Sequence, residues 1–278
     1  MIKFTISCLC LYLMIVVVIF LEQRKMQYFP NISPIKSPSA HGWPQIQQAK
    51  LQTSDGLNHI AWYLPPKNSD KPVLIYFHGN GGQMPDRVPK VNIYAQDGYG
   101  LMLVEYRGYG GQEGDISEQG LYKDAKAAMT WLLEKHTEDQ IIIYGESIGT
   151  GVAVETATHY PKAKALVLEA GFSSAADVAA DIYFYIPVHY LMKDQYKSAE
   201  KIGQLEMPIY MIHGDQDRVI PLHFGQKLHQ AAKPHAILDV IVGAGHNDLY
   251  EYGGGDRIRT FIKTLLPAID TEKPPLSE

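Results

Sequence analysis

Cysteine is nearly absent from this sequence. The only two, Cys8 and Cys10, lie in the apolar first segment of the chain, and none follows them. The rest of the protein therefore contains neither a disulfide framework nor a cysteine nucleophile. The sequence also lacks the charge that nucleic acid attracts, because the net charge is -5 and no run of Lys or Arg forms a basic groove. We predict no nucleic-acid partner.

Metal-binding motifs are missing as well. The sequence has no H-E-x-x-H pattern, and the histidines of its last third do not share the spacing of metal ligands on one face: His223, His229 and His235. We therefore predict no metal site.

The first segment is the longest hydrophobic run. Phe4 to Leu21 carries no charge, and roughly 18 residues at about 1.5 Å each can cross a hydrocarbon core of about 30 Å. A cleaved signal peptide is the alternative, but Val17–Leu21 offers no small residues for a cleavage site. We predict an uncleaved membrane anchor over residues 1–25. Basic residues flank the run on both sides, which leaves its orientation open: Lys3, Arg24 and Lys25.

The segment that follows the predicted anchor contains several prolines. Pro30, Pro34, Pro38 and Pro44 predict an extended linker over residues 26–45. A catalytic domain is then expected over residues 46–268, with a flexible tail over 269–278. Anchor and linker supply no strand to the predicted sheet, so we expect the domain to fold without the anchor.

Short apolar runs alternate with helical patterns through the predicted domain. The later runs lack alternation of polar and apolar residues, as strands buried on both faces do. We predict strands at Ile46–Leu51, Ile60–Leu64, Val73–Phe77, Leu101–Tyr106, Ile141–Tyr144, Ala165–Leu168, Ile209–Ile212 and Leu238–Val242, the first two as an antiparallel pair. We predict helices at Val88–Gln96, Glu118–His136, Ile148–Tyr160, Leu222–Ala232 and Asp256–Leu265. This order indicates an α/β fold with a mainly parallel sheet, helices on both faces, and an active site at the carboxyl ends of the strands.

One strand-to-helix junction carries a G-x-S-x-G sequence, Gly145 to Gly149. It directly follows the predicted strand Ile141–Tyr144 and opens the next predicted helix. A tight turn at this place lifts the serine above the sheet edge, and small flanking residues allow the close approach. The alternative is a glycine-rich turn with an ordinary N-cap serine. We predict Ser147 as a nucleophile.

A serine hydroxyl needs a base, and the base needs an orienting carboxylate. His246 alone among eleven histidines lies in a glycine-rich loop after the last predicted strand. Two aspartates follow the strand Ile209–Ile212. Asp215 comes after a glycine and is typical of a turn, whereas Asp217 lies further along the loop, where its side chain can reach a histidine. We predict Ser147, Asp217 and His246 as a catalytic triad.

Acyl transfer also needs preorganised donors for a developing oxyanion. Ile148, next to the serine, supplies one backbone N–H. The second is expected from the segment His78–Gly82 after the strand Val73–Phe77, with Asn80 as the candidate. A phosphate-binding loop is the alternative, but this segment lacks a G-K-[ST] ending and the Rossmann spacing.

With these residues assembled, the sequence resembles the α/β-hydrolase superfamily over roughly residues 46–266. More narrowly, it is similar to the membrane-anchored branch related to protein depalmitoylases and serine-aminopeptidase-like hydrolases. This resemblance implies an eight-stranded sheet and no cofactor. It rests on HGNGG at His78, EYRGYG at Glu105, GESIG at Gly145, HGDQD at His213 and GAGHND at Gly243.

An aromatic segment, Tyr183–Met192, is the candidate lid over the site, although simple packing on the sheet remains the alternative. If it lines a pocket, Tyr183, Phe184 and Tyr185 are the predicted substrate-binding residues, and an apolar acyl group is the natural guest. We expect a hydrolase that cleaves carboxylic ester or thioester bonds of a small acyl substrate or an acylated protein. The alternatives are a small-peptide hydrolase and a catalytically inactive, membrane-tethered binding protein.

Overall fold

The structure is a computed structural model that describes residues 1–266 of the 278-residue chain. The predicted tail, and the last two residues of the predicted catalytic domain, lie outside the described residues.

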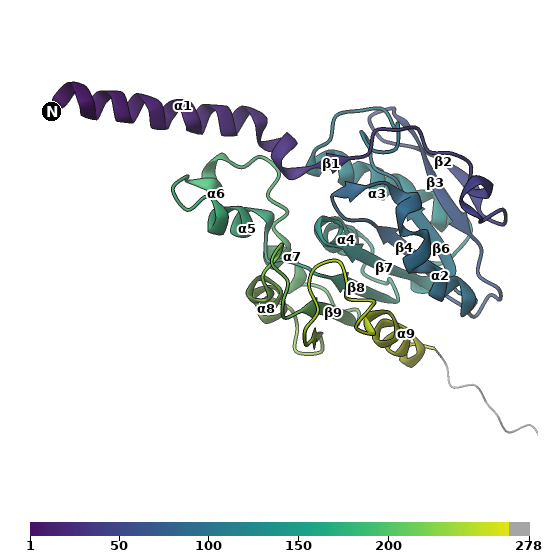
Figure 1. The fold of residues 1–278 in the computed structure, drawn as a ribbon. Coiled ribbons are helices and arrows are strands. Elements are labelled where there is room, and N and C mark those ends of the chain that lie inside the picture. The colour runs from purple at the N-terminus through teal and green to yellow at the C-terminus, as the bar shows by residue number, and fades with distance from the viewer. Residues whose placement is uncertain (267–278) are drawn as a thin grey trace, which may run out of the picture.

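An eight-stranded sheet forms the centre of the molecule (Figure 1). Its spatial order is β10-β9-β8-β7-β4-β6-β3-β2, and all pairs are parallel except β2–β3 and β3–β6. The fold class and the antiparallel leading pair are thereby confirmed, and each strand lies within two residues of its predicted ends. The strands are β2 (Gln47–Gln52), β3 (Asn58–Leu64), β4 (Val73–Phe77), β6 (Gly100–Val104), β7 (Ile141–Glu146), β8 (Ala165–Glu169), β9 (Ile209–Gly214) and β10 (Ile237–Ile241).

Helices cover both faces of this sheet because its strands are apolar on both sides. In β4, Val73, Ile75 and Phe77 belong to one core cluster and Leu74 and Tyr76 to the other. The first cluster includes residues of α3 (Glu118–Leu133), α4 (Ile148–His159) and α8 (Leu222–Ala231), and the second includes residues of α2 (Val88–Gln96) and α9 (Gly254–Thr264). All five helices match the predicted ones in place and type.

Three short helices between β8 and β9 have no counterpart among the predicted elements. They are α5 (Ala175–Ile182), α6 (Val188–Leu191) and α7 (Ser198–Ile202). The first two fold back on each other as a small hairpin, hereafter the α5–α6 hairpin (residues 175–191), which stands out from the sheet (Figure 1). The segment is too short for a separate cap domain.

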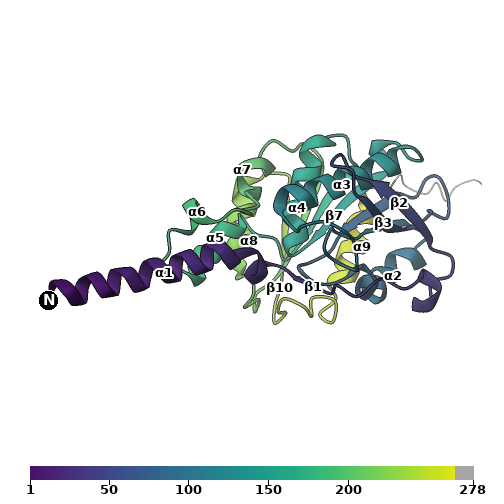
Figure 2. The ribbon, with the colours of Figure 1, turned by 90° about the horizontal axis from the view of Figure 1, so that it is seen from above.

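The N-terminal helix α1 (Ile2–Gln27) is long and apolar enough to cross a membrane. Its first turns project away from the domain, whereas the helix from about its middle onward lies beside the α5–α6 hairpin (Figures 1 and 2). Tyr12 donates a hydrogen bond to the carbonyl of Tyr185 over 2.8 Å, and Gln23 accepts one from the N–H of Lys193 over 2.7 Å. The helix is therefore packed against the rest of the structure along its C-terminal half and not along its first turns.

The segment predicted as an extended linker also packs on the domain. Its two-residue strand β1 (Phe29–Pro30) pairs in parallel with β5 (Gly81–Gly82), and Tyr28 is buried with its hydroxyl 2.8 Å from that of Tyr196. Trp43, at the other end of the segment, is buried in the second core cluster. The prolines keep this segment out of the main sheet, but its aromatic side chains attach it to the surface.

Candidate active site

Ser147 occupies a strained turn between β7 and α4. Its φ of 52° and ψ of -121° are rare for a residue with a side chain. The two glycines of the motif explain why the turn closes, because a Cβ at Gly145 would overlap the carbonyl of Gly149, and a Cβ at Gly149 would overlap that of Phe77. The N–H of Ser147 donates to the carbonyl of Glu169 in β8 over 2.8 Å. Backbone contacts thus hold the hydroxyl at the carboxyl edge of the sheet.

His246 lies between this serine and an aspartate. Its Nε2 is 3.1 Å from the hydroxyl oxygen of Ser147, and its Nδ1 is 2.7 Å from Oδ2 of Asp217. The short contact to a carboxylate assigns the proton to Nδ1, which leaves Nε2 to accept the hydrogen bond from the serine hydroxyl. The Ser147 hydroxyl can therefore transfer its proton to Nε2 of the His246 imidazole, while Asp217 holds the ring at Nδ1.

Asp217 is buried and well hydrogen-bonded. Its Oδ1 accepts the N–H groups of Val219 and Ile220, each over 2.8 Å. Burial alone would raise the pKa of Asp217, but hydrogen bonds from His213 and His246 hold that pKa well below its usual range. Asp217 is therefore ionised wherever the protein is folded near neutral pH.

Asp215 has a structural role in the loop after β9, as its position after a glycine indicated. Its Oδ1 accepts the N–H of Gly243 over 2.7 Å, which ties the loop after β9 to the loop after β10. Asp248 closes the histidine loop in the same way by accepting the N–H of Gly245 over 2.6 Å. Of the two aspartates after β9, the structure brings only Asp217 to His246.

The two residues predicted to supply oxyanion donors, Asn80 and Ile148, line the same cavity as Ser147. The side-chain amide of Asn80 donates to the carbonyl of Gln27, the last residue of α1, over 2.9 Å. Its backbone N–H and that of Ile148 have no acceptor among the hydrogen bonds of the described residues. The donors that this site can offer to an oxyanion are therefore both backbone groups.

Sequence reasoning did not identify the contacts that hold the Asn80 loop. The carbonyl of Asn80 accepts the N–H of Phe29 over 3.1 Å and the hydroxyl of Tyr109 over 2.9 Å. His78, two residues earlier, lies 2.8 Å from the buried Glu105. Because Phe29 belongs to the segment after α1, the N-terminal region positions this loop directly.

A partly buried ionic network lies beside the serine turn. Glu146 accepts a hydrogen bond from Arg87 over 2.9 Å and lies 3.4 Å from Lys90, which also pairs with Glu169 of β8. Burial raises the pKa of Glu146, but the charges of Lys90 and Arg87 outweigh it and lower that pKa to about 2. The network joins α2 to β7 and β8 at the point where the turn is strained.

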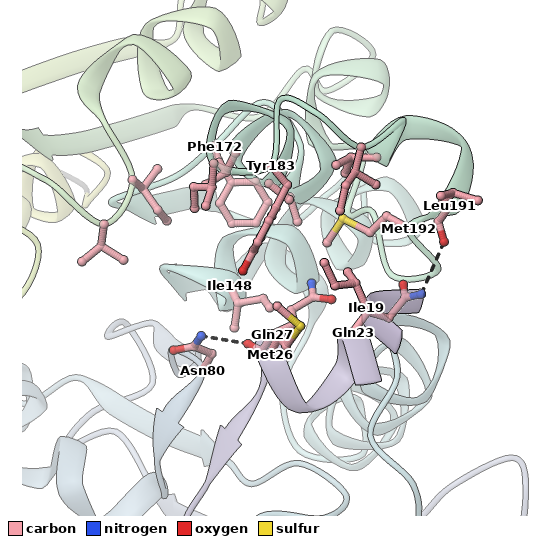
Figure 3. A pocket seen from close by; sticks show the side chains of 18 of the residues that line it. Ile19, Gln23, Met26, Gln27, Asn80, Ile148, Phe172, Tyr183, Leu191 and Met192 are labelled. Atoms are coloured by element: carbon pink, nitrogen blue, oxygen red, sulfur yellow. Dashed lines mark hydrogen bonds between the residues drawn. The ribbon is translucent and has the colours of Figure 1, made fainter. Parts of the chain in front are cut away.

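Ser147 lines an apolar cavity of about 320 Å³. Figure 3 shows this cavity from close by. Of the three predicted substrate-binding residues, only Tyr183 lines it. Phe184 and Tyr185 do not, and 84% and 48% of their surfaces are exposed. The correction has a local cause: α5 ends at Ile182, and the turn that follows directs successive side chains to different sides.

The cavity has a second wall that sequence reasoning missed entirely. Residues of α1 line it at helical spacing: Val16, Ile19, Phe20, Gln23, Met26 and Gln27. An apolar helix offers no polar face to mark the side that contacts protein, so the pattern of the sequence carried no signal for them. Among residues 1–266, no group of three or more His, Cys, Asp or Glu side chains is placed to hold a metal ion.

Comparisons with known proteins show the family to which the chain belongs. The family model of the serine aminopeptidases (S33) matches residues 68–182. An uncharacterized protein of Mycobacterium tuberculosis is 35% identical over 254 residues, which are 89% of this chain and 90% of that protein. The chain belongs to the α/β-hydrolase superfamily. It is a serine hydrolase of that superfamily, as its resemblance implied.

More distant α/β-hydrolases include a named lipase and a solved esterase. The lysophosphatidylserine lipase ABHD12 of Danio rerio is 26% identical over 251 residues, and the match spans 77% of this chain and 65% of that lipase. A Pyrococcus furiosus esterase superposes with a TM-score of 0.69 at 17% identity, covering 85% of this chain and 98% of the esterase. The latter shows the shared fold.

Proposed function

We propose that this α/β-hydrolase cleaves the ester or thioester bond of an acyl substrate through an acyl-serine intermediate. The observation that carries the proposal is the hydrogen-bonded series Ser147–His246–Asp217, which opens on an apolar cavity. The names of the related lipase and esterase point to the same class of bond.

The reaction follows from the positions of the groups. The Ser147 oxygen attacks the acyl carbonyl carbon while Nε2 of His246 takes the hydroxyl proton. The N–H groups of Ile148 and Asn80 stabilise the oxyanion, and His246 then protonates the departing alcohol or thiol. Water, deprotonated by His246, attacks the acyl-serine and releases the carboxylic acid and free Ser147. Asp217 holds the ring and stabilises its charged form.

Peptide hydrolysis is less well supported. An aminopeptidase needs an acidic group to bind the substrate's amine, and no residue that lines the cavity in the described part of the chain is acidic. The hydrogen-bonded series also argues against an inactive binding protein, because a site without chemistry has no need of a strained serine.

We also propose that α1 is a retained membrane anchor. A signal sequence passes the same test of length and composition. Cleavage after it, however, would remove six residues that line the cavity and would expose an apolar wall to water. The lining residues therefore favour a helix that stays attached.

A serine-directed probe tests the proposed chemistry. Ser147→Ala should abolish labelling by a fluorophosphonate and lower kcat on methylumbelliferyl acetate by about a million-fold, as loss of such a nucleophile can. Ser69→Ala, at an exposed position between β3 and β4, is the matched control and should keep labelling. Labelling that persisted in Ser147→Ala would assign the nucleophile elsewhere.

A further inference from the structure

The cavity beside Ser147 lies between α1 and the α5–α6 hairpin (Figure 3). From α1 its lining runs from Val16 to Gln27, about three helical turns or ~16 Å at 1.5 Å per residue. The opposite wall is apolar and comes mainly from the hairpin: Val178, Ala179, Ile182, Ile186, Val188 and Leu191. The cavity therefore runs along the helix from the serine toward the N-terminal half of α1.

The first charged residues after the apolar run of α1 indicate where the helix leaves the hydrocarbon core and meets water. The uncharged run ends at Leu21, and Arg24 pairs with Asp194 just beyond the hairpin over 2.7 Å. Lys193 lies with its ammonium 4.5 Å from the ring centre of Phe20. If the uncharged run fills the hydrocarbon core, Val16 to Phe20 lie about 8 Å or less inside its edge at Leu21. The far end of the cavity is then at hydrocarbon depth.

The hairpin reaches the same depth and exposes aromatic side chains there. Phe184 and Tyr190 are 84% and 90% exposed, and Tyr185 contacts Tyr12, which lies well within the uncharged run. Large exposed aromatic groups are unfavourable in water but are typical of a membrane boundary.

The charged residues of the hairpin do not oppose this placement. Asp177 pairs with Lys227 over 2.9 Å, and His189 lies 3.8 Å from Asp177. Asp181 follows Asp177 by one turn and is exposed on the face of α5 away from its cavity-lining residues, which is the face that this placement leaves in water.

We infer that the cavity opens sideways into the bilayer between α1 and the α5–α6 hairpin, so that the acyl chain of a membrane-resident lipid ester reaches Ser147 without entering water. The helix then serves as an anchor and as the wall that selects long acyl chains, with Ile19 as a specificity-determining residue. This inference rests on the proposed function, because it assigns a substrate class to the same serine.

The first test compares two tryptophan substitutions in adjacent residues of α1. Ile19→Trp fills the cavity, whereas Val18→Trp places the same bulk on the opposite side, where Val18 is 54% exposed and does not line the cavity. Full-length protein in phosphatidylcholine vesicles is assayed on methylumbelliferyl palmitate and on methylumbelliferyl acetate. The readout is the ratio of the two rates, which cancels differences in the amount of active enzyme.

Ile19→Trp should lower the palmitate-to-acetate ratio about tenfold or more, since the indole occupies the space of the long chain but not that of acetate, and overfilling an apolar site costs roughly 1–3 kcal/mol. Val18→Trp should leave the ratio unchanged. Equal ratios in the two variants would overturn the inference. Absence of ester hydrolysis and of fluorophosphonate labelling in the wild-type protein would overturn the proposed function instead, and the inference with it.

The second test does not depend on the variants. A long-chain alkyl fluorophosphonate with a photoreactive terminal group is coupled to Ser147 in the vesicles and irradiated. We expect cross-links to residues 16–20 of α1, to the hairpin and to vesicle lipid. Cross-links confined to the loop at Val219, which lines the cavity on another side, would overturn the inference.

Discussion

Arg24 of α1 forms a two-point ion pair with Asp194, 170 residues further along the chain. Its Nε and Nη2 donate to the two carboxylate oxygens over 2.7 and 3.1 Å, and Asp194 is buried. Oδ1 of Asp194 also accepts the N–H of Glu118, the first residue of α3. One carboxylate thus joins the apolar helix, the segment after the hairpin and the hydrolase core.

Loss of this pair should loosen α1 from the domain. Arg24→Ala should lower the free energy of unfolding by roughly 1–2 kcal/mol, less than for a fully buried pair because the arginine is partly exposed. Lys25→Ala removes an exposed neighbouring charge and should change it by less than about 0.5 kcal/mol. Urea unfolding in detergent measures both, and an equal effect of the two variants would contradict the role of the ion pair.

The two aspartates after β9 provide a test of the proposed acid. Asp217→Asn should lower kcat by about four orders of magnitude, because an amide cannot hold the histidine tautomer that accepts the serine proton. Asp215→Asn should have a much milder effect, since Asp215 accepts only a backbone N–H from Gly243. Steady-state hydrolysis of methylumbelliferyl acetate measures both. The reverse ranking would assign the acid to Asp215.

The serine turn should not tolerate a methyl group at Gly149. Gly149→Ala would place a Cβ against the carbonyls of Phe77 and His78, which belong to the backbone and cannot move aside. We expect a loss of about 3 kcal/mol or more in stability and slower fluorophosphonate labelling. Gly81→Ala is the control in the neighbouring loop, where a Cβ meets nothing within 4 Å. Similar melting temperatures for the two variants would contradict the packing argument.

Glu146 should contribute to the acid sensitivity of the fold. Because its pKa in the folded protein is lowered from 4.5 to about 2, its contribution to stability is present above about pH 4.5 and is lost as the pH falls through about 2. Glu146→Gln should therefore be less stable near neutral pH, by roughly 2–3 kcal/mol, and should lose less stability between these two pH values.

Thermal unfolding over a pH series measures this difference. Glu134→Gln, at an exposed position on the surface, should follow the wild-type curve. Parallel curves for Glu146→Gln and the wild type would mean that Glu146 carries no lowered pKa.

Local patterns were sufficient to predict the sheet and the residues that meet at its edge. Apolar runs such as Val73–Phe77 need no distant partner to be recognised, because a strand covered on both faces must be apolar throughout. The motif around Ser147 predicted a strand-to-helix turn for a similarly local reason, as only glycine fits at Gly145 and Gly149. Chain order then placed Asp217 and His246 at the carboxyl ends of neighbouring strands.

Only the tertiary structure decided what surrounds that edge. An apolar helix such as α1 has the same character on every side, so its sequence predicts that it can cross a membrane but not which side contacts protein. That choice depends on contacts with residues more than 160 positions away, such as Tyr12 with Tyr185 and Arg24 with Asp194. The same packing places the cavity on the side of the hairpin where Tyr183 lies and Phe184 does not. Packing between remote segments, which no local pattern records, made the N-terminal helix a wall of the candidate active site.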